Sequence, residues 1–185
     1  MDIDFLLQYV EFSSDELESI KKFFFKQTIR RNELFLKEGD ICNSVAYVEN
    51  GYLILSQVSE SGSEQILYFS SPGDLISDYI SFLRDRPTDT RIRALNDSSL
   101  LVINKEDIYH LYETMFNFQK LGRIIAEIYL VDFANKLKTD SLPPLLRYDQ
   151  LIAQKPDIFE QVPQYMIASY LGISPEWLSK IRSKK

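Results

Sequence analysis

The sequence predicts an α+β fold, in which an antiparallel β-roll is followed by a long helix and then by short helices. Short apolar, aromatic or β-branched segments broken by turn residues fill residues 34–104. From residue 105 the apolar positions recur at steps of three and four, and the last 20 or so residues show a helix–glycine–helix pattern. At 185 residues and 45% hydrophobic content, the chain can bury a sizeable core.

The N-terminal part, residues 1–104, is expected to be the roll. A short helix comes first, capped by Ser13 or Ser14, and its pattern gives way to strands at about Gln27. Asn50-Gly51 favours a two-residue hairpin turn, because both residues accept positive φ. The expected strand-rich segments are 34–40, 44–58, 64–74 and 90–104. Several short strands of this kind are typical of a sandwich or a barrel-like roll.

Residues 105–138 are predicted to form one long helix with an apolar stripe. A helix of about 30 residues is far longer than average, so something must cover that stripe along its length. Either the roll alone covers it, or a helix of a second subunit does, and we favour the second because the roll is small. The side chains expected at this dimer seam are Met115, Phe118, Leu121, Ile125 and Ile128.

The segment TDSLPP at 139–144 should end the long helix, since proline breaks a continuing helix but is tolerated in the first turn of a new one. We therefore place a domain boundary here and expect residues 139–185 to form a separate helical domain. Its predicted helices span 143–154, 163–171 and 175–183.

The last two helices have the pattern of a helix-turn-helix. Gly172 supplies the left-handed conformation of the turn, and Ala168 is small enough to let the second helix approach. Ser174 can then cap the second helix, with Pro175 and Glu176 in its first turn. The apolar residues expected to face inward are Ile167, Leu171, Ile173, Leu178 and Ile181.

The outward face of the second helix reverses the charge of the chain. The formal net charge is −6, yet four basic residues and no acidic one follow Trp177. Such a local reversal of charge is what an element that contacts phosphate requires. The alternative is a plain helical hairpin whose solvent-exposed face happens to be basic. The candidate DNA-binding residues are Ser174, Pro175, Glu176, Trp177, Ser179, Lys180, Arg182, Lys184 and Lys185.

Enzyme and metal chemistry find little support in the sequence. The single cysteine, Cys42, cannot build a disulfide or a thiolate cluster within the chain, and the single histidine, His110, lies in a helical pattern. No phosphate loop, GxSxG or HExxH occurs. We expect no enzyme, no metal and no cofactor. An acidic N-terminus and the lack of a long apolar run predict a cytoplasmic protein with no membrane contact.

The order of strand roll, long helix and helix-turn-helix resembles the Crp/Fnr family of bacterial transcription regulators over nearly the whole chain. The matching motifs are EGD at 38–40, NGYLIL at 50–55, PGD at 72–74, RAL at 93–95, and RYDQLIAQKP followed by VPQYMIASYLGISPEWLSKIRSKK. The last two look like the short-tailed branch found in Bacteroidetes-type bacteria.

This resemblance implies a cyclic-nucleotide-binding-type jelly roll, a dimerisation helix, and a second terminal helix that enters the major groove of double-stranded DNA. Glu176 lines up with an acidic residue of the family that accepts a hydrogen bond from a cytosine amino group. Lys180 lines up with a basic residue of the family that lies near guanine or phosphate. Trp177 could stack on sugar or a thymine methyl, or pack on the first helix. The partners implied are DNA, a second copy, RNA polymerase and an unknown small effector. We expect no wing after the second helix.

The candidate effector pocket departs from the family pattern. Where relatives that bind cyclic AMP carry a Gly-Glu pair, this chain has Ser77-Asp78, and where they carry an Arg-Ser pair it has Thr88-Asp89. The cation that would hold the phosphate is missing and a carboxylate stands where the phosphate should lie, which disfavours a cyclic nucleotide unless Arg84, Arg86 or Arg91, all near in sequence, swings in. The residues assigned to this pocket are Gly73, Ser77, Asp78, Tyr79, Thr88 and Asp89.

Two functions therefore follow from the sequence. The first is a homodimeric, sequence-specific DNA-binding transcription regulator whose roll lacks the usual phosphate contact. The alternative is a cyclic-nucleotide or other small-ligand sensor, or a protein-interaction module, that does not read DNA.

Overall fold

A computed structural model describes residues 2–59 and 62–183 of the chain. The strands are β1 (Phe24–Ile29), β2 (Leu34–Leu36), β3 (Ser44–Asn50), β4 (Leu53–Val58), β5 (Glu64–Ser70), β6 (Leu75–Ile76), β7 (Thr90–Ala94) and β8 (Ser98–Asn104). The helices are η1 (Asp4–Gln8), α1 (Ser14–Lys21), α2 (Tyr79–Arg84), α3 (Lys105–Thr114), α4 (Phe116–Asp140), α5 (Pro144–Gln154), α6 (Ile158–Gln161), α7 (Gln164–Leu171) and α8 (Pro175–Ser183).

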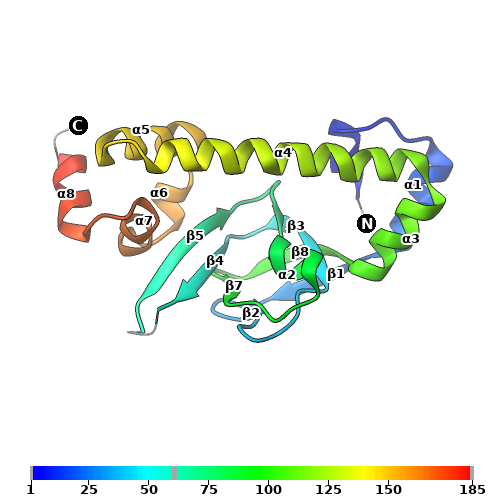
Figure 1. The fold of residues 1–185 in the computed structure, drawn as a ribbon, viewed down its shortest axis with the longest axis horizontal. Coiled ribbons are helices and arrows are strands. Elements are labelled where there is room, and N and C mark those ends of the chain that lie inside the picture. Colours follow the sequence, from blue (N-terminus) through cyan, green and yellow to red (C-terminus); the bar gives the residue numbers. More distant parts are fainter. Residues whose placement is uncertain (1, 60–61, 184–185) are drawn as a thin grey trace.

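The strands form two antiparallel sheets. Sheet A has the order β1-β8-β3-β6, and sheet B has the order β2-β7-β4-β5. Helix α4 runs along one side of this roll, with α1 and α3 near its beginning and α5–α8 gathered at its other end (Figure 1). The α+β fold class is thus confirmed, with the β-roll, the long helix and the C-terminal helices in the expected order.

The main core lies between the two sheets and beneath the first half of α4. It joins side chains from both sheets to side chains from α3 and α4, all of them buried. Its members include Ala46, Val48, Leu53, Ile92, Ala94, Leu100, Leu101, Ile108, Leu111, Phe118 and Leu121.

This core changes the interpretation of the apolar stripe on the long helix. Phe118 and Leu121 are 5% and 2% exposed and belong to the core, while Met115 and Ile125 are partly buried against it. Of the five side chains expected at a dimer seam, only Ile128 is exposed, at 41%. The roll therefore covers the first half of the stripe, because α4 packs directly on the chain's own sheets there.

The single helix expected over 105–138 is divided in two at Met115. This residue has an extended backbone, with φ −137° and ψ 109°, so α3 ends at Thr114 and α4 begins at Phe116. Close packing accompanies the bend, because a Cβ at Gly122 would come within 2.3 Å of the Tyr112 hydroxyl. The one residue type without a Cβ lets α3 fold back against α4.

The hairpin predicted at Asn50-Gly51 is wrong. Strand β3 belongs to sheet A and β4 to sheet B, so the chain crosses between sheets at this point. Gly51 has φ +95°, and a Cβ there would lie 2.1 Å from the Ser98 Oγ. The glycine is needed for this tight corner, and the hairpin is instead formed by β4 and β5.

A second core joins sheet B to the C-terminal helices. Ile54, Ile66 and Phe69 project from the outer face of sheet B into this cluster. From the helices come Tyr148, Leu151, Ile158, Val162, Met166, Ile167, Ala168, Leu171, Leu178 and Ile181. The C-terminal helices are therefore packed on the roll as well as on one another.

Some elements lie outside the segments expected from the sequence. Strand β1 starts at Phe24, ahead of the expected change at Gln27, and η1, β6, α2 and α6 fall between the expected segments. Within the described residues, no helix is long and apolar enough to cross a membrane, and no group of three or more metal-ligating side chains comes together.

Candidate functional site

Helices α7 and α8 form a tight helix-turn-helix. Helix α7 ends at Gly172, whose φ of 64° and ψ of 37° place it in the left-handed region. The Ile173 amide donates back to the Ala168 carbonyl at 3.0 Å, which closes the turn. The Ser174 Oγ then accepts from the Trp177 amide at 3.2 Å at the start of α8. Glycine and serine thus have the roles expected from their chemistry.

The inward side of this pair is fully packed. Ile167 and Leu178 are 0% exposed, and Ala168 is 1% exposed where the helices meet. Leu171 and Ile181 are also buried, and Ile173 packs against the same cluster. The two helices are consequently held as one unit, so that the opposite face of α8 has a fixed orientation.

The outward side of α8 carries the candidate DNA-binding residues that the structure describes. Ser174, Pro175, Glu176, Trp177, Ser179, Lys180 and Arg182 are all exposed. Trp177 is 45% exposed and is not one of the hydrophobic side chains packed into the second core. Lys184 and Lys185 lie outside the described residues.

The pKa of the Glu176 carboxyl is lowered, which favours its ionised form. A hydrogen bond from the Ser174 side chain is the largest influence, and together with the backbone amide of Glu176 and the charge of Lys180 it lowers the pKa of the Glu176 carboxyl. An ionised carboxylate can only accept hydrogen bonds, which is the property needed to bind an amino group. The surface of α8 thus offers one acceptor beside donors at Lys180 and Arg182.

The candidate effector residues are arranged around Asp78, which is only 7% exposed. Its Oδ1 accepts from the Ile80 and Ser81 amides at 3.1 Å, so it caps α2. Its Oδ2 accepts from Thr88 Oγ1 and, at 2.9 Å, from Thr90 Oγ1. Burial raises the pKa of Asp78, but the hydrogen bonds from Thr88, Ser81, Thr90 and Ile80 outweigh it and lower the pKa overall.

Thr88 is fixed through its backbone as well. Its carbonyl accepts from the Gly39 amide and its amide donates to the Asp40 carbonyl, both at 2.9 Å. Thr88 and Thr90 are 5% and 8% exposed. The EGD turn and strand β7 therefore hold both hydroxyls against Asp78.

The other assigned effector residues are not part of this network. Asp89 is exposed and accepts from the Gln57 side chain at 3.1 Å, because alternate residues of an extended segment face opposite ways. Asp89 therefore lies outside the network around Asp78. Ser77 donates to the Ser44 carbonyl at 2.9 Å, and the Tyr79 ring lies 4.9 Å from that of Tyr129 on α4. Gly73 lies in the exposed turn after β5.

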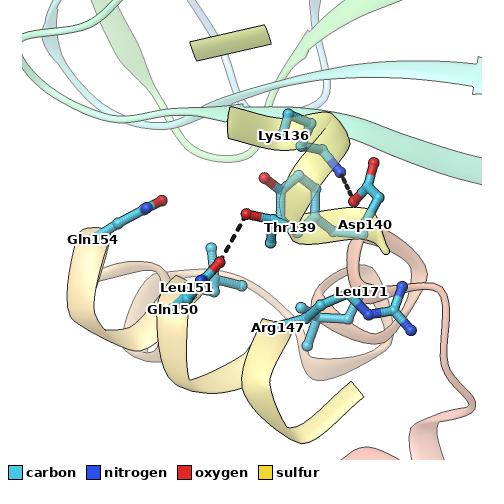
Figure 2. A pocket seen from close by; sticks show the side chains of 9 residues that line it. Lys136, Thr139, Asp140, Arg147, Gln150, Leu151, Gln154 and Leu171 are labelled. Atoms are coloured by element: carbon cyan, nitrogen blue, oxygen red, sulfur yellow. Dashed lines mark hydrogen bonds and ion pairs between the residues drawn. The ribbon is translucent and has the colours of Figure 1, made fainter. Parts of the chain in front are cut away.

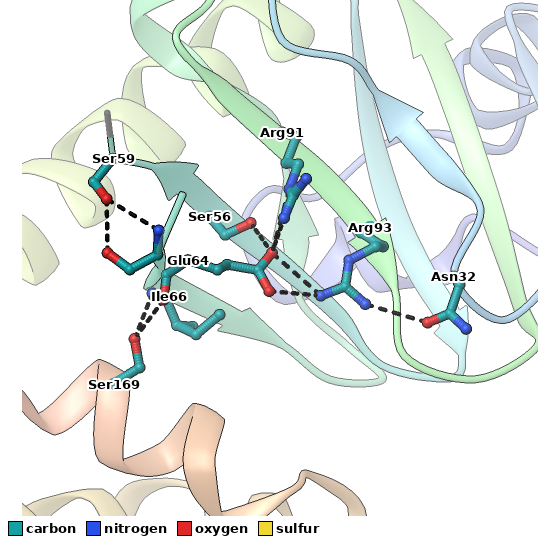
Figure 3. A network of polar contacts seen from close by, with 9 residues as sticks. Asn32, Ser56, Ser59, Glu64, Ile66, Arg91, Arg93 and Ser169 are labelled. Atoms are coloured by element: carbon teal, nitrogen blue, oxygen red, sulfur yellow. Dashed lines mark hydrogen bonds and ion pairs between the residues drawn. The ribbon is translucent and has the colours of Figure 1, made fainter. Parts of the chain in front are cut away.

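Sequence reasoning missed Thr90, which shares the face of Thr88 two residues further on. That period of two is the signal that could have identified it. A second missed network lies on the outer face of sheet B (Figure 3). There Glu64 accepts from Ser56 at 2.8 Å, from Arg91 at 2.7 Å and from Arg93 at 2.9 Å. Burial raises the pKa of Glu64, but the hydrogen bonds and charges of these partners outweigh it and lower the pKa overall.

A small polar cleft lies where α4, α5 and α7 meet (Figure 2). Lys136 pairs with Asp140 at 2.6 Å, and Thr139 donates to Gln150 at 2.7 Å. The Nε of Arg147 is buried there without a hydrogen-bond partner among the described residues. The cleft marks the junction between the long helix and the C-terminal helices.

Comparisons with known proteins agree with this architecture. Residues 26–115 match the cyclic nucleotide-binding domain family. A segment of 51 residues is 39% identical to the anaerobic regulatory protein of Haemophilus influenzae, covering 28% of this chain and 20% of that protein. The matched segment thus spans about a fifth of that relative's length.

Solved structures resemble most of the chain. FixK2 from Bradyrhizobium japonicum aligns with a TM-score of 0.71 at 16% identity, over 87% of this chain and 83% of that one. The global regulator CLP of Xanthomonas campestris, described as responsive to c-di-GMP, aligns with a TM-score of 0.66 at 16% identity, over 93% and 91% of the two chains. The catabolite activator protein of Thermus thermophilus aligns with a TM-score of 0.57 at 18% identity, over 97% and 85%. Residues 26–115 are thus similar to the cyclic nucleotide-binding domain family, and the chain as a whole has the fold of FixK2, CLP and the catabolite activator protein.

Proposed function

We propose that this chain is a non-catalytic, sequence-specific DNA-binding transcription regulator. The observation that carries the proposal is the α7–α8 pair, which is packed on one side and presents an exposed acid and bases on the other. A helix of this kind fits the major groove, where Glu176 can accept from a cytosine amino group and Lys180 can donate to guanine. The Crp/Fnr fold supports this reading.

The proposed regulator acts as a homodimer through the second half of α4. Beyond Ile125 this helix exposes apolar side chains on two opposite faces, about 180° apart by helical geometry. Ile128 and Val131 lie on the first face, beside a shallow groove that also includes Ile124. Leu130, Phe133 and Leu137 lie on the second and are 66%, 53% and 58% exposed. We place the two-fold seam on the Ile128 face.

In this proposal the roll does not use a cyclic-nucleotide phosphate contact. Four hydrogen-bond donors already occupy the Asp78 carboxylate, and the hydroxyl of Thr88 stands where a cationic side chain would be required. Arg91, which is close in sequence, is engaged by Glu64 on the outer face of sheet B. A phosphodiester ligand would have to displace these partners and would still meet an anion.

A DNA-binding titration tests the proposal. Duplexes selected from a random pool should bind with an affinity that falls steeply between about 50 and about 200 mM salt. Glu176→Ala should lose roughly ten- to a hundred-fold of discrimination at one base pair per half-site. Asp15→Ala, on the exposed start of α1, is the matched control and should change neither. Failure to bind duplex DNA even at low salt contradicts the proposal and favours the sensor or interaction module.

The seam is tested by sedimentation at micromolar concentration. Val131→Glu should convert the dimer to a monomer, because it places a charge in an apolar interface. Leu137→Glu, on the opposite face, should leave the dimer intact. If Leu137→Glu gives a monomer and Val131→Glu does not, the dimer interface lies on the Leu137 face. A monomeric parent protein contradicts the proposed dimer.

A further inference from the structure

The C-terminal helices rest on the outer face of sheet B through a compact apolar contact. Helix α7 lies along β5, and Ile66 and Phe69 of that strand share a buried cluster with Ile167 of the helix. The Phe69 and Tyr170 rings are 5.1 Å apart. Strand β5 is therefore the part of the roll that positions the helix-turn-helix.

Ser169 gives this contact a polar component at the edge of the sheet. Its Oγ accepts from the Ile66 amide at 3.1 Å and donates to the Glu64 carbonyl at 3.0 Å (Figure 3). Because β5 is the last strand of sheet B, these two backbone groups have no neighbouring strand on that side. The side chain of α7 thus takes the place of a strand partner, so the Ile66 amide is protected only while α7 is docked.

Lys155 makes a second polar contact at the other end of β5. It follows α5 in the chain, and its Nζ pairs with the Asp74 carboxylate and donates to the Phe69 carbonyl at 3.1 Å. The same Nζ lies 5.0 Å from the centre of the Tyr68 ring. The Lys155 and Asp74 side chains are 22% and 26% exposed, so the pair is largely shielded from water.

Asp74 belongs to a short stretch of chain that also reaches the candidate effector site. Its carboxylate accepts from the Ser71 amide at 2.8 Å and from the Ser71 hydroxyl at 3.0 Å, which fixes the turn after β5. Four residues later, Asp78 binds Thr88 and Thr90. Residues 71–78 therefore contact the C-terminal helices at one end, through Asp74, and bind the two threonines of the candidate effector site at the other. Between these ends the Gly73 amide and the Asp74 carbonyl are hydrogen-bonded to Val48 of β3, and β6 pairs with β3.

We propose that residues 71–78 act as a latch that couples docking of the C-terminal helices to closure of the Asp78 site. In the docked state Lys155 is bound to Asp74 and Ser169 covers the edge of β5. Loosening Asp78 from its threonine partners shifts the turn, weakens the Lys155–Asp74 contact and releases α7 from β5. The latch is independent of whether α8 reads DNA.

Hydrogen exchange at the Ile66 amide measures this release. Lys155→Met keeps the length of the side chain but removes its charge, and it should speed exchange at Ile66 by roughly ten-fold or more. The Leu101 amide, on an inner strand of sheet A, should be unaffected. Lys21→Met, which removes an ion pair with Glu18 on α1, is the matched control and should leave Ile66 unchanged.

A second arm tests the coupling to the effector site. Thr90→Val removes one donor to Asp78 and should also speed exchange at Ile66, although Thr90 lies on another strand. In the double variant with Lys155→Met, Thr90→Val should speed exchange at Ile66 by less than it does alone, since both changes release the same contact. Unchanged exchange at Ile66 in either single variant overturns the proposal. Equal acceleration at Ile66 and Leu101 also overturns it, because the helices and the roll would then open as one unit.

Discussion

Asp78 in the roll and Glu176 on α8 are both carboxylates with a lowered pKa, but their surroundings differ completely. Asp78 is buried, and four donors from its own chain occupy its two oxygens. Glu176 is exposed, and its neighbours Lys180 and Arg182 point to solvent with it. The first carboxylate is already satisfied, whereas the second still has acceptor capacity for a partner.

The difference separates two uses of polar chemistry in one fold. In the roll, hydroxyls and amides of the chain itself occupy both oxygens of Asp78, so this network contributes to stability. On α8 the polar groups are exposed and contribute little to folding, so under the proposed function they are available to a partner. Variants at the two positions should therefore affect different properties.

The largest expected effect is on stability. Asp78→Asn should lower the free energy of unfolding by about 2–4 kcal/mol, because an amide cannot accept from all four donors and leaves buried groups unpaired. Urea unfolding followed by circular dichroism measures this. Glu176→Gln should leave the unfolding midpoint unchanged. If both variants behave alike, the contrast between the buried and the exposed carboxylate is lost.

A pH series examines the same contrast. The folded-state pKa of Asp78 is lowered, so its contribution to stability is fully present above the unfolded-state value of about 3.9 and is lost as pH falls through the folded-state pKa. The difference in unfolding free energy between the parent protein and Asp78→Asn should accordingly shrink as the pH is lowered from about 6 toward that range. A difference that grows on acidification contradicts the assignment.

The smallest effect is expected on α8. Arg182→Gln should weaken DNA binding about equally across sequences, as loss of one phosphate contact does. It should also reduce the slope of log affinity against log salt concentration by about 1. Its unfolding midpoint should not change. Fluorescence anisotropy measures the salt dependence of DNA affinity for both variants. It should separate Arg182→Gln from Glu176→Ala, which should instead relax specificity. A loss of specificity in Arg182→Gln would instead make it a base-reading residue.

Much of the fold could be predicted from the sequence, because local patterns specify it. Most of the strands, helices α5, α7 and α8, and the Gly172 turn follow from alternation, proline placement and capping chemistry. Packing decided the rest. Asn50-Gly51 has the same residue types whether the chain turns within a sheet or crosses to another, and only the placement of β3 in sheet A and β4 in sheet B distinguishes the two.

The candidate sites show the same division. The outward residues of α8 could be named because helical geometry fixes which side faces away from Ile167 and Leu178. The stripe on α4 could not be assigned, since periodicity shows that Phe118 and Leu121 are apolar but not that the chain's own roll covers them. The closure of the effector site by Thr90 likewise depends on the fold.

The contact that Ser169 of α7 makes with β5 also bears on how the molecule avoids aggregation. An edge strand with free amides and carbonyls is a template on which another chain can add a strand. While α7 is docked, the Ile66 amide and the Glu64 carbonyl are occupied, and the bulk of the helix shields the strand. Any movement that lifts α7 therefore leaves these backbone groups of β5 unpaired, so release of α7 carries a risk of self-association.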